Sequence, residues 1–173
     1  IDVFWTGTHV LSTEYTPNHL RQVADQLDRK PFIWDNYPVN DGPRMSRFLH
    51  LRAPIRPAEI AADVSGLAIN PMNQPNLSRI PLHAMAQSLN GRSKGNIDMQ
   101  TLAALERQLP SDLAHALSED LDAFQTKGLD GLESATKTAL ILKYGAWHHP
   151  AASELCRWLQ GDYVVSADIL TDP

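Results

Sequence analysis

Short polar side chains gather directly after two apolar runs, and their types suit the binding of a sugar. Asn36 and Asp41 follow the apolar run Phe32–Trp34, and Asn70 follows a second run further along the chain. Amides and carboxylates hydrogen-bond to hydroxyls, and an aromatic face packs against the apolar face of a sugar ring. Trp34, Asn36, Asp41 and Asn70 are therefore expected to line one pocket for a neutral, hydroxyl-rich ligand. The alternative is structural, because Asn and Asp also form turns and tryptophan also fills cores.

These residues require elements that bring the ends of different strands together. Apolar runs rich in β-formers predict strands, and apolar residues at helical spacing predict helices between them. The expected strands are 1–5, 32–34 and 66–69, and the expected helices are 16–28, 57–63 and 76–89. Three successive strand–loop–helix units predict a parallel sheet with right-handed crossovers. The loops after such strands lie on one side of the sheet, as the proposed pocket requires.

The segment 42–57, rich in proline and arginine, is predicted to be a long surface loop. Its four arginines either steer an anionic group or keep the loop soluble; they are Arg44, Arg47, Arg52 and Arg56.

Beyond residue 91 the sequence becomes helical in pattern. The polar stretch 91–95 contains two glycines and reads as a hinge. Helices are expected at 99–109, from Ser111 to about Phe124, at 132–144 and at 151–159. In the second of these, Leu113, Leu117, Leu121 and Phe124 are expected to face inward. Roughly four helices thus predict an all-α region.

Composition narrows the function classes. With 43% hydrophobic residues in 173, the chain can form a packed core, and its net charge of −5 argues against a general nucleic-acid binder. No run is long enough to predict a membrane span, and no signal peptide is recognised. The single cysteine, Cys156, excludes an intrachain disulfide and slightly favours the cytoplasm. Because Ile1 already reads as part of a strand, the chain is expected to be a piece of something larger.

Weaker candidates for chemistry lie in the helical region. His148 and His149 are adjacent, but the sequence offers no carboxylate at a spacing suited to a shared metal, so a role at a helix end is expected. Cys156 is expected to be a buried structural thiol. An acidic cluster is expected to be a solvated helix face; it comprises Glu119, Asp120 and Asp122.

Three segments, in this order and at these intervals, resemble the O-GlcNAcase family, the β-N-acetylglucosaminidases once described as hyaluronidases. They are Phe4-Trp-Thr-Gly7, Arg29-Lys-Pro-Phe-Ile-Trp-Asp-Asn-Tyr-Pro-Val-Asn-Asp41 and Asn70-Pro-Met-Asn-Gln74. The resemblance covers about residues 1–90. It implies an α/β then all-α fold: residues 1–92 would be the last three β/α units of a (β/α)₈ TIM barrel, strands six to eight, and residues 96–173 a helical bundle domain.

The chemistry that the resemblance implies is retaining hydrolysis of a terminal N-acetylglucosamine. The acetamido oxygen of the substrate attacks the anomeric carbon, and an adjacent Asp-Asp pair assists it. The 173 residues contain no Asp-Asp dipeptide. No catalytic residue is therefore expected in this chain, and the N-terminal part of the same enzyme is expected to carry the pair with the remaining strands.

Substrate binding is what the resemblance carries onto named residues. Asn36 resembles the asparagine near the acetamido group, Asp41 the carboxylate that holds the outer hydroxyls, Asn70 its neighbour, and Trp34 the aromatic wall. The run 44–54 departs from the family pattern, which leaves the preference for the aglycone open. The expected partner is a glycoprotein or oligosaccharide bearing N-acetylglucosamine, with no cofactor, metal, nucleic acid or membrane. The alternative function is a non-catalytic sugar- or protein-binding module left from such an enzyme.

Overall fold

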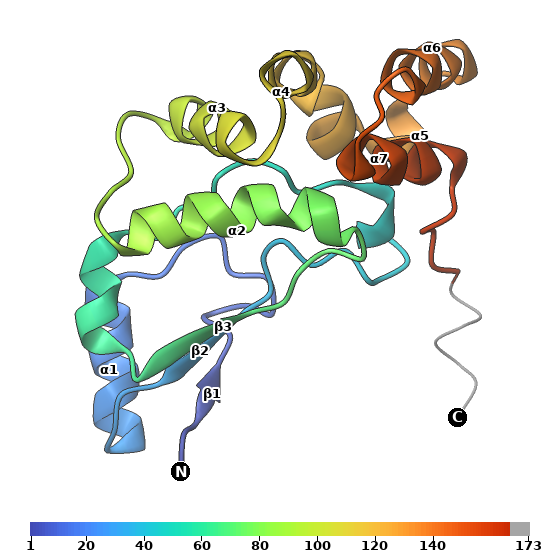
Figure 1. Cartoon of the computed structure of the whole chain (residues 1–173). Coiled ribbons are helices and arrows are strands. Elements are labelled where there is room, and N and C mark those ends of the chain that lie inside the picture. The colour runs from blue at the N-terminus through green and yellow to red at the C-terminus, as the bar shows by residue number, and fades with distance from the viewer. Residues whose placement is uncertain (167–173) are drawn as a thin grey trace.

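A three-stranded parallel sheet forms the N-terminal half of the molecule (Figure 1). A computed structural model describes residues 1–166. Strands β1 (Phe4–Trp5), β2 (Phe32–Asp35) and β3 (Gly66–Ile69) lie in the order β1-β2-β3, with Phe4 opposite Phe32 and Phe32 opposite Gly66. The predicted parallel sheet is confirmed, although β1 is shorter than the expected strand 1–5. The pairing leaves one edge of β1 and one edge of β3 open within the described chain.

Helical segments after the strands cover one face of this sheet. These are α1 (Pro17–Leu27), the 3₁₀ helix η2 (Ala58–Asp63) and α2 (Pro75–Leu89). Helix α1 begins as the sequence predicts, because the Thr16 hydroxyl accepts a hydrogen bond from the His19 amide at 3.4 Å and Pro17 occupies the first turn. Beneath α1 and η2 lies a small buried cluster formed by Tyr15, Leu20, Ile33 and Ile60.

The opposite face of the sheet is aromatic and open. The ring of Phe4 lies edge-on to Phe32, with centroids 5.2 Å apart, and to Trp34, with centroids 5.5 Å apart. The exposed fractions are 61% for Phe4 and 38% for Trp34, whereas Ile33 on the other face is fully buried. In Figure 1 the described helices lie on one side of the strands, and the other side has no helix over it.

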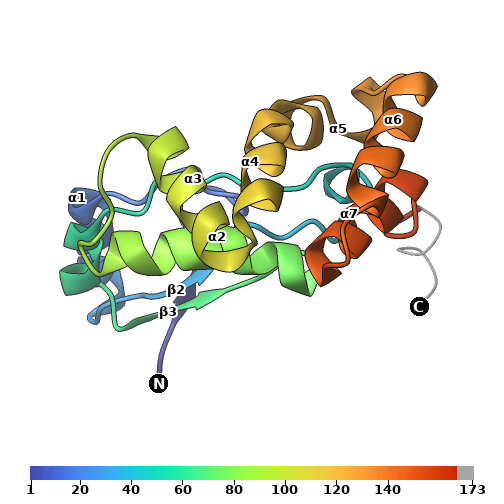
Figure 2. The same cartoon turned by 45° about the horizontal axis from the view of Figure 1, so that its top comes forward.

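The second half of the chain is helical, as expected. Its elements are α3 (Ile97–Gln108), α4 (Ser111–Glu119), the π-helix η3 (Ala123–Lys127), α5 (Gly128–Gly131), α6 (Ser134–Gly145) and α7 (Pro150–Gln160). Figure 2 shows α3 and α4 crossing over α2, with α7 at the N-terminal end of α2. The predicted inward residues of the second helical segment are all buried. No helix in residues 1–166 is long and apolar enough to cross a membrane.

The segment 42–57 differs from the prediction of a surface loop. It contains the short 3₁₀ helix η1 (Met45–Arg47), and its Leu49 and Leu51 side chains are fully buried in the core shared with the later helices. Backbone bonds hold it there, since the Leu49 amide donates to the Phe124 carbonyl at 3.1 Å. The prediction failed because the partners of this segment are distant in sequence: the Met72 sulfur that accepts from the His50 amide lies 22 residues later, and Phe124 lies 75 residues after Leu49.

Helix α2 joins the two halves. The carboxylate of Glu154 on α7 accepts hydrogen bonds from the backbone amides of Asn76 (3.0 Å) and Leu77 (2.9 Å) in its first turn. Gln74, the N-cap residue, makes no side-chain cap bond, so a residue from a distant helix satisfies these orphan donors. The division into domains 1–92 and 96–173 stays a prediction, and residues 167–173 of the second lie outside the described part.

Candidate functional site

Asn36 is the centre of a polar cluster at the carboxyl ends of β2 and β3. Its side-chain oxygen accepts hydrogen bonds from Trp34 Nε1 at 2.9 Å and from Asn70 Nδ2 at 3.2 Å. Its own Nδ2 donates to the carbonyl of Val10, in the loop after β1, at 2.8 Å. Three loops that follow three parallel strands therefore meet at one amide, which leaves one Nδ2 hydrogen without a protein partner among the described residues. The structure thus brings together three of the four predicted site residues.

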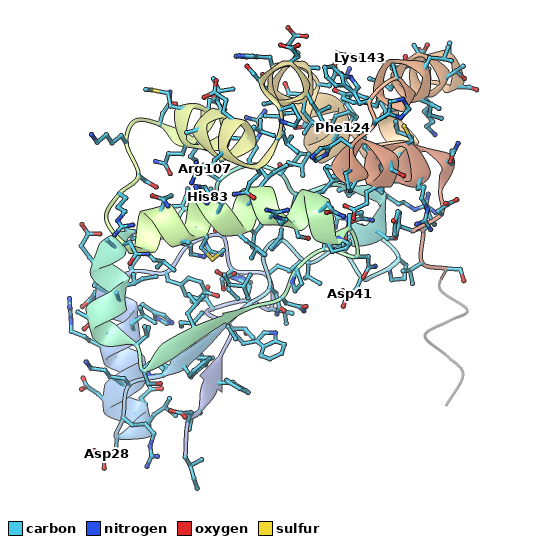
Figure 3. All side chains as sticks on the ribbon, in the orientation of Figure 1. Asp28, Asp41, His83, Arg107, Phe124 and Lys143 are labelled. Atoms are coloured by element: carbon cyan, nitrogen blue, oxygen red, sulfur yellow. The ribbon has the colours of Figure 1, made fainter. Side chains whose placement is uncertain are left out.

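Asp41, the fourth predicted residue, stands apart from this cluster. It is exposed and makes no side-chain hydrogen bond or ion pair within the described chain. Figure 3 shows it projecting away from the ribbon at the rim of the loop after β2. A carboxylate in this state keeps all its acceptor sites available to a ligand.

A buried ion pair fixes the loop that carries Asn36. The Arg56 guanidinium bonds both carboxylate oxygens of Asp35, at 2.5 and 2.9 Å, and both side chains are 1% exposed. Its remaining N–H groups donate to the carbonyls of Ser12, Thr13 and Ile55, so all five donors are used. Arg56 therefore neither steers an anion nor solubilises a loop, as the sequence had suggested, because it ties the loops after β1 and β2 together.

Asn40 braces the same loop against the one after β3. Its Nδ2 donates to Gln74 Oε1 at 2.8 Å, and its Oδ1 accepts from the Asn73 amide at 2.9 Å. Both Asn40 and Gln74 are fully buried. The short polar residues around Asn36 are thus divided between roles: Asp35 and Asn40 hold the backbone, whereas Asn36, Asp41 and Asn70 remain at least partly accessible.

The helical region also reaches this loop, through Gln125 on the π-helix η3. Its Oε1 accepts from the backbone amides of Leu51 and Arg52 at 2.9 and 2.8 Å, and its Nε2 lies 3.5 Å from the Tyr37 hydroxyl. The Tyr37 hydroxyl in turn donates to the Arg52 carbonyl at 2.6 Å, and burial raises the pKa of Tyr37 well above its ordinary value. Sequence reasoning missed Gln125, because no local pattern announces a single π turn.

A largely apolar pocket of about 370 Å³ opens beside Asn36. Its walls include Leu11, Tyr37 and Ile55, together with His50. Burial lowers the pKa of His50 to about 4, so its imidazole is neutral at physiological pH. The pocket adjoins the predicted sugar-binding residues but is lined by only one of them, Asn36.

For the other arginines of the segment 42–57 the sequence predicts either the steering of an anion or the solubility of a loop. Arg47 pairs with Asp130 at 2.7 Å, and Arg52 bridges Asp98 and Asp122 at 2.6 and 2.7 Å. These contacts hold the segment against the helices. Arg47 and Arg52 therefore have a structural role, and neither steering of an anion nor loop solubility describes them. Arg44 is exposed and forms no ion pair within residues 1–166.

The weaker candidates have structural roles. The ring of His149 caps α7 by accepting from the Ala151 amide at 3.2 Å, in agreement with the expected position at a helix end. Cys156 is half-buried against the helical core, and burial raises the pKa of its thiol. The acidic cluster is more than a solvated face, since Asp120 accepts from the Tyr144 hydroxyl at 2.7 Å. No group of three potential metal ligands exists among the described residues.

Comparison with known proteins gives one matching family model and several proteins of similar sequence or structure. Residues 1–125 match the family model described as beta-N-acetylglucosaminidase. Protein O-GlcNAcase of Rattus norvegicus is 30% identical over 100 residues, and that of Mus musculus gives the same value. A solved mutant of an O-GlcNAc hydrolase from Thermobaculum terrenum is similar in structure over 92% of this chain, with a TM-score of 0.71 and 29% identity.

The matched region is a minor part of each relative. The alignment covers 54% of this chain and 11% of each rodent protein, and the structural match covers 41% of the bacterial chain.

Proposed function

The chain belongs to the β-N-acetylglucosaminidase family, and on this premise we propose that it forms the sugar-binding part of a glycoside hydrolase that removes terminal β-linked N-acetylglucosamine. The reaction is retaining and substrate-assisted: the acetamido oxygen of the sugar attacks the anomeric carbon and forms an oxazoline, which water then opens. An adjacent Asp-Asp pair in the rest of the enzyme polarises the acetamido group and acts as general acid and base. This chain supplies no catalytic residue.

The observation that carries the proposal is the junction at Asn36. Loops from three parallel strands meet at its amide, with Asn70 bonded to it and the indole of Trp34 locked by it. We assign the free Nδ2 hydrogen of Asn36 to the sugar near its acetamido group, and the Asp41 carboxylate to the outer hydroxyls. Trp34 offers its aromatic face to the ring. A site held this rigidly loses little conformational entropy when a sugar binds.

The proposal includes the rest of a (β/α)₈ barrel, in which β1, β2 and β3 are strands six to eight and residues 96–173 form the helical domain that follows. Two observations support it. The sheet has helices on one face and an exposed aromatic face on the other, as a segment of barrel wall has. Its outer edges are open, which closure of a barrel removes. The expected partner is therefore the N-terminal part of the same enzyme.

The test combines composition with sugar binding. Intact mass spectrometry of the purified, denatured protein is expected to reveal polypeptide beyond these 173 residues. The sequence of that polypeptide is expected to contain an adjacent Asp-Asp pair after a predicted strand. That assembly should hydrolyse an aryl β-N-acetylglucosaminide and be blocked by an oxazoline-mimicking inhibitor. Activity absent from an assembly that contains the pair would refute the enzyme. A lone chain of 173 residues with sugar affinity but no activity would instead indicate a non-catalytic binding module.

Replacement of Asp41 by alanine tests the assigned site. The lost charged hydrogen bonds should weaken binding of the inhibitor by about 2–3 kcal/mol. The matched control is Asp25→Ala, which removes an exposed carboxylate of α1 that forms no ion pair in the described chain. Equal affinity of Asp41→Ala and the unmodified protein would remove Asp41 from the sugar site.

A further inference from the structure

A second pocket lies between α2 and α3, and its lining is cationic. It encloses about 440 Å³. Arg92 and Lys94 reach it from the linker between the two helices, Arg107 from α3 and His83 from α2. In Figure 3, Arg107 and His83 lie one above the other between the two helices. None of the residues that line this pocket belongs to the proposed sugar site.

The charges in this pocket are not neutralised by the protein. No Asp or Glu lines it, and within residues 1–166 no ion pair engages Arg92, Lys94 or Arg107. Six cations elsewhere in the described chain are paired with carboxylates, namely Arg21, Arg47, Arg52, Arg56, Lys143 and Arg157, and others, such as Arg44, are unpaired but do not line this pocket. Three unpaired cations, Arg92, Lys94 and Arg107, therefore share one concave place on a chain whose net charge is −5.

The linker presents its charges on a fixed backbone. Gly91 and Gly95 have φ values of +65° and +75°, which favour glycine and set the two bends of the linker. The Arg92 amide donates to the Gln87 carbonyl at 2.8 Å, and Gln100 Nε2 donates to the Gly95 carbonyl at 3.0 Å. The sequence predicts a polar, glycine-bearing hinge here, and both of its ends are hydrogen-bonded to the helices.

We propose that this pocket binds a small phosphate-class anion. The guanidinium groups of Arg92 and Arg107 match the paired oxygens of a phosphate, and Lys94 adds a third donor group of positive charge. Uncharged donors complete the lining, from Gln87, Ser93 and Gln100. The volume exceeds that needed for one phosphate and falls in the range of pockets for small organic ligands. The ligand is therefore either free pyrophosphate or a small phosphate ester.

Calorimetric titration of the whole chain, at constant ionic strength, tests the proposal with two probes. Pyrophosphate represents the free anion and glycerol 2-phosphate the ester, and the tighter of the two identifies the source. Saturable binding of one probe per chain is expected. The double variant Arg92→Gln with Arg107→Gln should weaken it at least about tenfold, which corresponds to the loss of one charge-assisted hydrogen bond.

A control with the same change in charge separates a built site from general attraction. Lys30→Gln with Lys127→Gln removes two exposed, unpaired cations from other elements, and its affinity should remain that of the unmodified chain. Absence of saturable binding by both probes would overturn the proposal, as would equal weakening by the two double variants. All four positions are exposed, so unchanged unfolding midpoints are expected and would exclude misfolding as the cause.

Discussion

Replacing Asp35 by asparagine should destabilise the protein strongly, because it leaves the Arg56 charge buried without its counter-ion. Both side chains are 1% exposed, and the carboxylate takes two of the five guanidinium bonds. Removal of one partner of a buried ion pair costs about 3–5 kcal/mol of unfolding free energy. Since the asparagine oxygen retains part of the hydrogen bonding, the lower end, about 3 kcal/mol, is expected. That is a large share of the roughly 5–15 kcal/mol by which a domain is stable.

The pair between Arg21 and Asp63, which is open to solvent on the arginine side, provides the control. Its N–O distance is 3.0 Å, and the exposed fractions of the side chains are 59% for Arg21 and 16% for Asp63, against 1% for both Asp35 and Arg56. Solvent screening reduces the contribution of such a pair to about 0–1 kcal/mol. Asp63→Asn makes the same chemical change as Asp35→Asn and should therefore have little effect.

Urea unfolding of both variants, followed by tryptophan fluorescence, measures the difference. The midpoint of Asp35→Asn should fall while the denaturant slope stays constant, which would identify a loss of stability in the native state rather than a change in the denatured one. Equal losses in the two variants would refute the reasoning, since the carboxylate of Asp35 would then contribute no more than that of Asp63, whose partner is solvated.

Three further predictions concern contacts that span the chain. Burial lowers the pKa of His50 to about 4 in the folded state. The unfolded chain therefore takes up a proton that the folded chain does not, and the free energy of unfolding should fall by up to about 3 kcal/mol as pH falls from 6.5 to 4. Urea unfolding at several pH values should show a weaker pH dependence for His50→Gln. Glu154→Ala leaves two amides of the first turn of α2 without acceptors and should cost about 2–4 kcal/mol in urea unfolding, whereas loss of the exposed Glu133 should cost little. Gln125→Ala likewise orphans the Leu51 and Arg52 amides, and their hydrogen exchange should accelerate; unchanged exchange would contradict the contact.

The sequence predicts best where structure is decided locally. The runs 32–34 and 66–69 became β2 and β3 almost to the residue, because bulky apolar side chains between turn formers have few alternatives to a strand. Thr16 and Pro17 began α1 for an equally local reason. The meeting of Trp34, Asn36 and Asn70 followed from parallel topology alone, since the ends of neighbouring parallel strands lie together.

The parts that escaped prediction depend on distant partners. Arg56 reads as one of four loop arginines until the fold brings Asp35, 21 residues earlier, against it. Leu49 and Leu51 stand among prolines and arginines, and their burial depends on a core to which α2 and the later helices contribute. Gln125 acts through a single π turn whose sequence is that of an ordinary helix. Each of these signals exists only in the assembled chain.

The cap that Glu154 places on α2 has a consequence for the order in which the molecule assembles. The acceptor lies 78 residues after Asn76, so a ribosome completes α2 long before that acceptor emerges. Until α7 docks, the first turn of α2 has only water for these amides, and we expect it to fray. The loop just before that turn carries Asn70 and Asn73. The loop after β3, which carries Asn70 of the proposed sugar site, should thus be among the last parts of the nascent protein to fold.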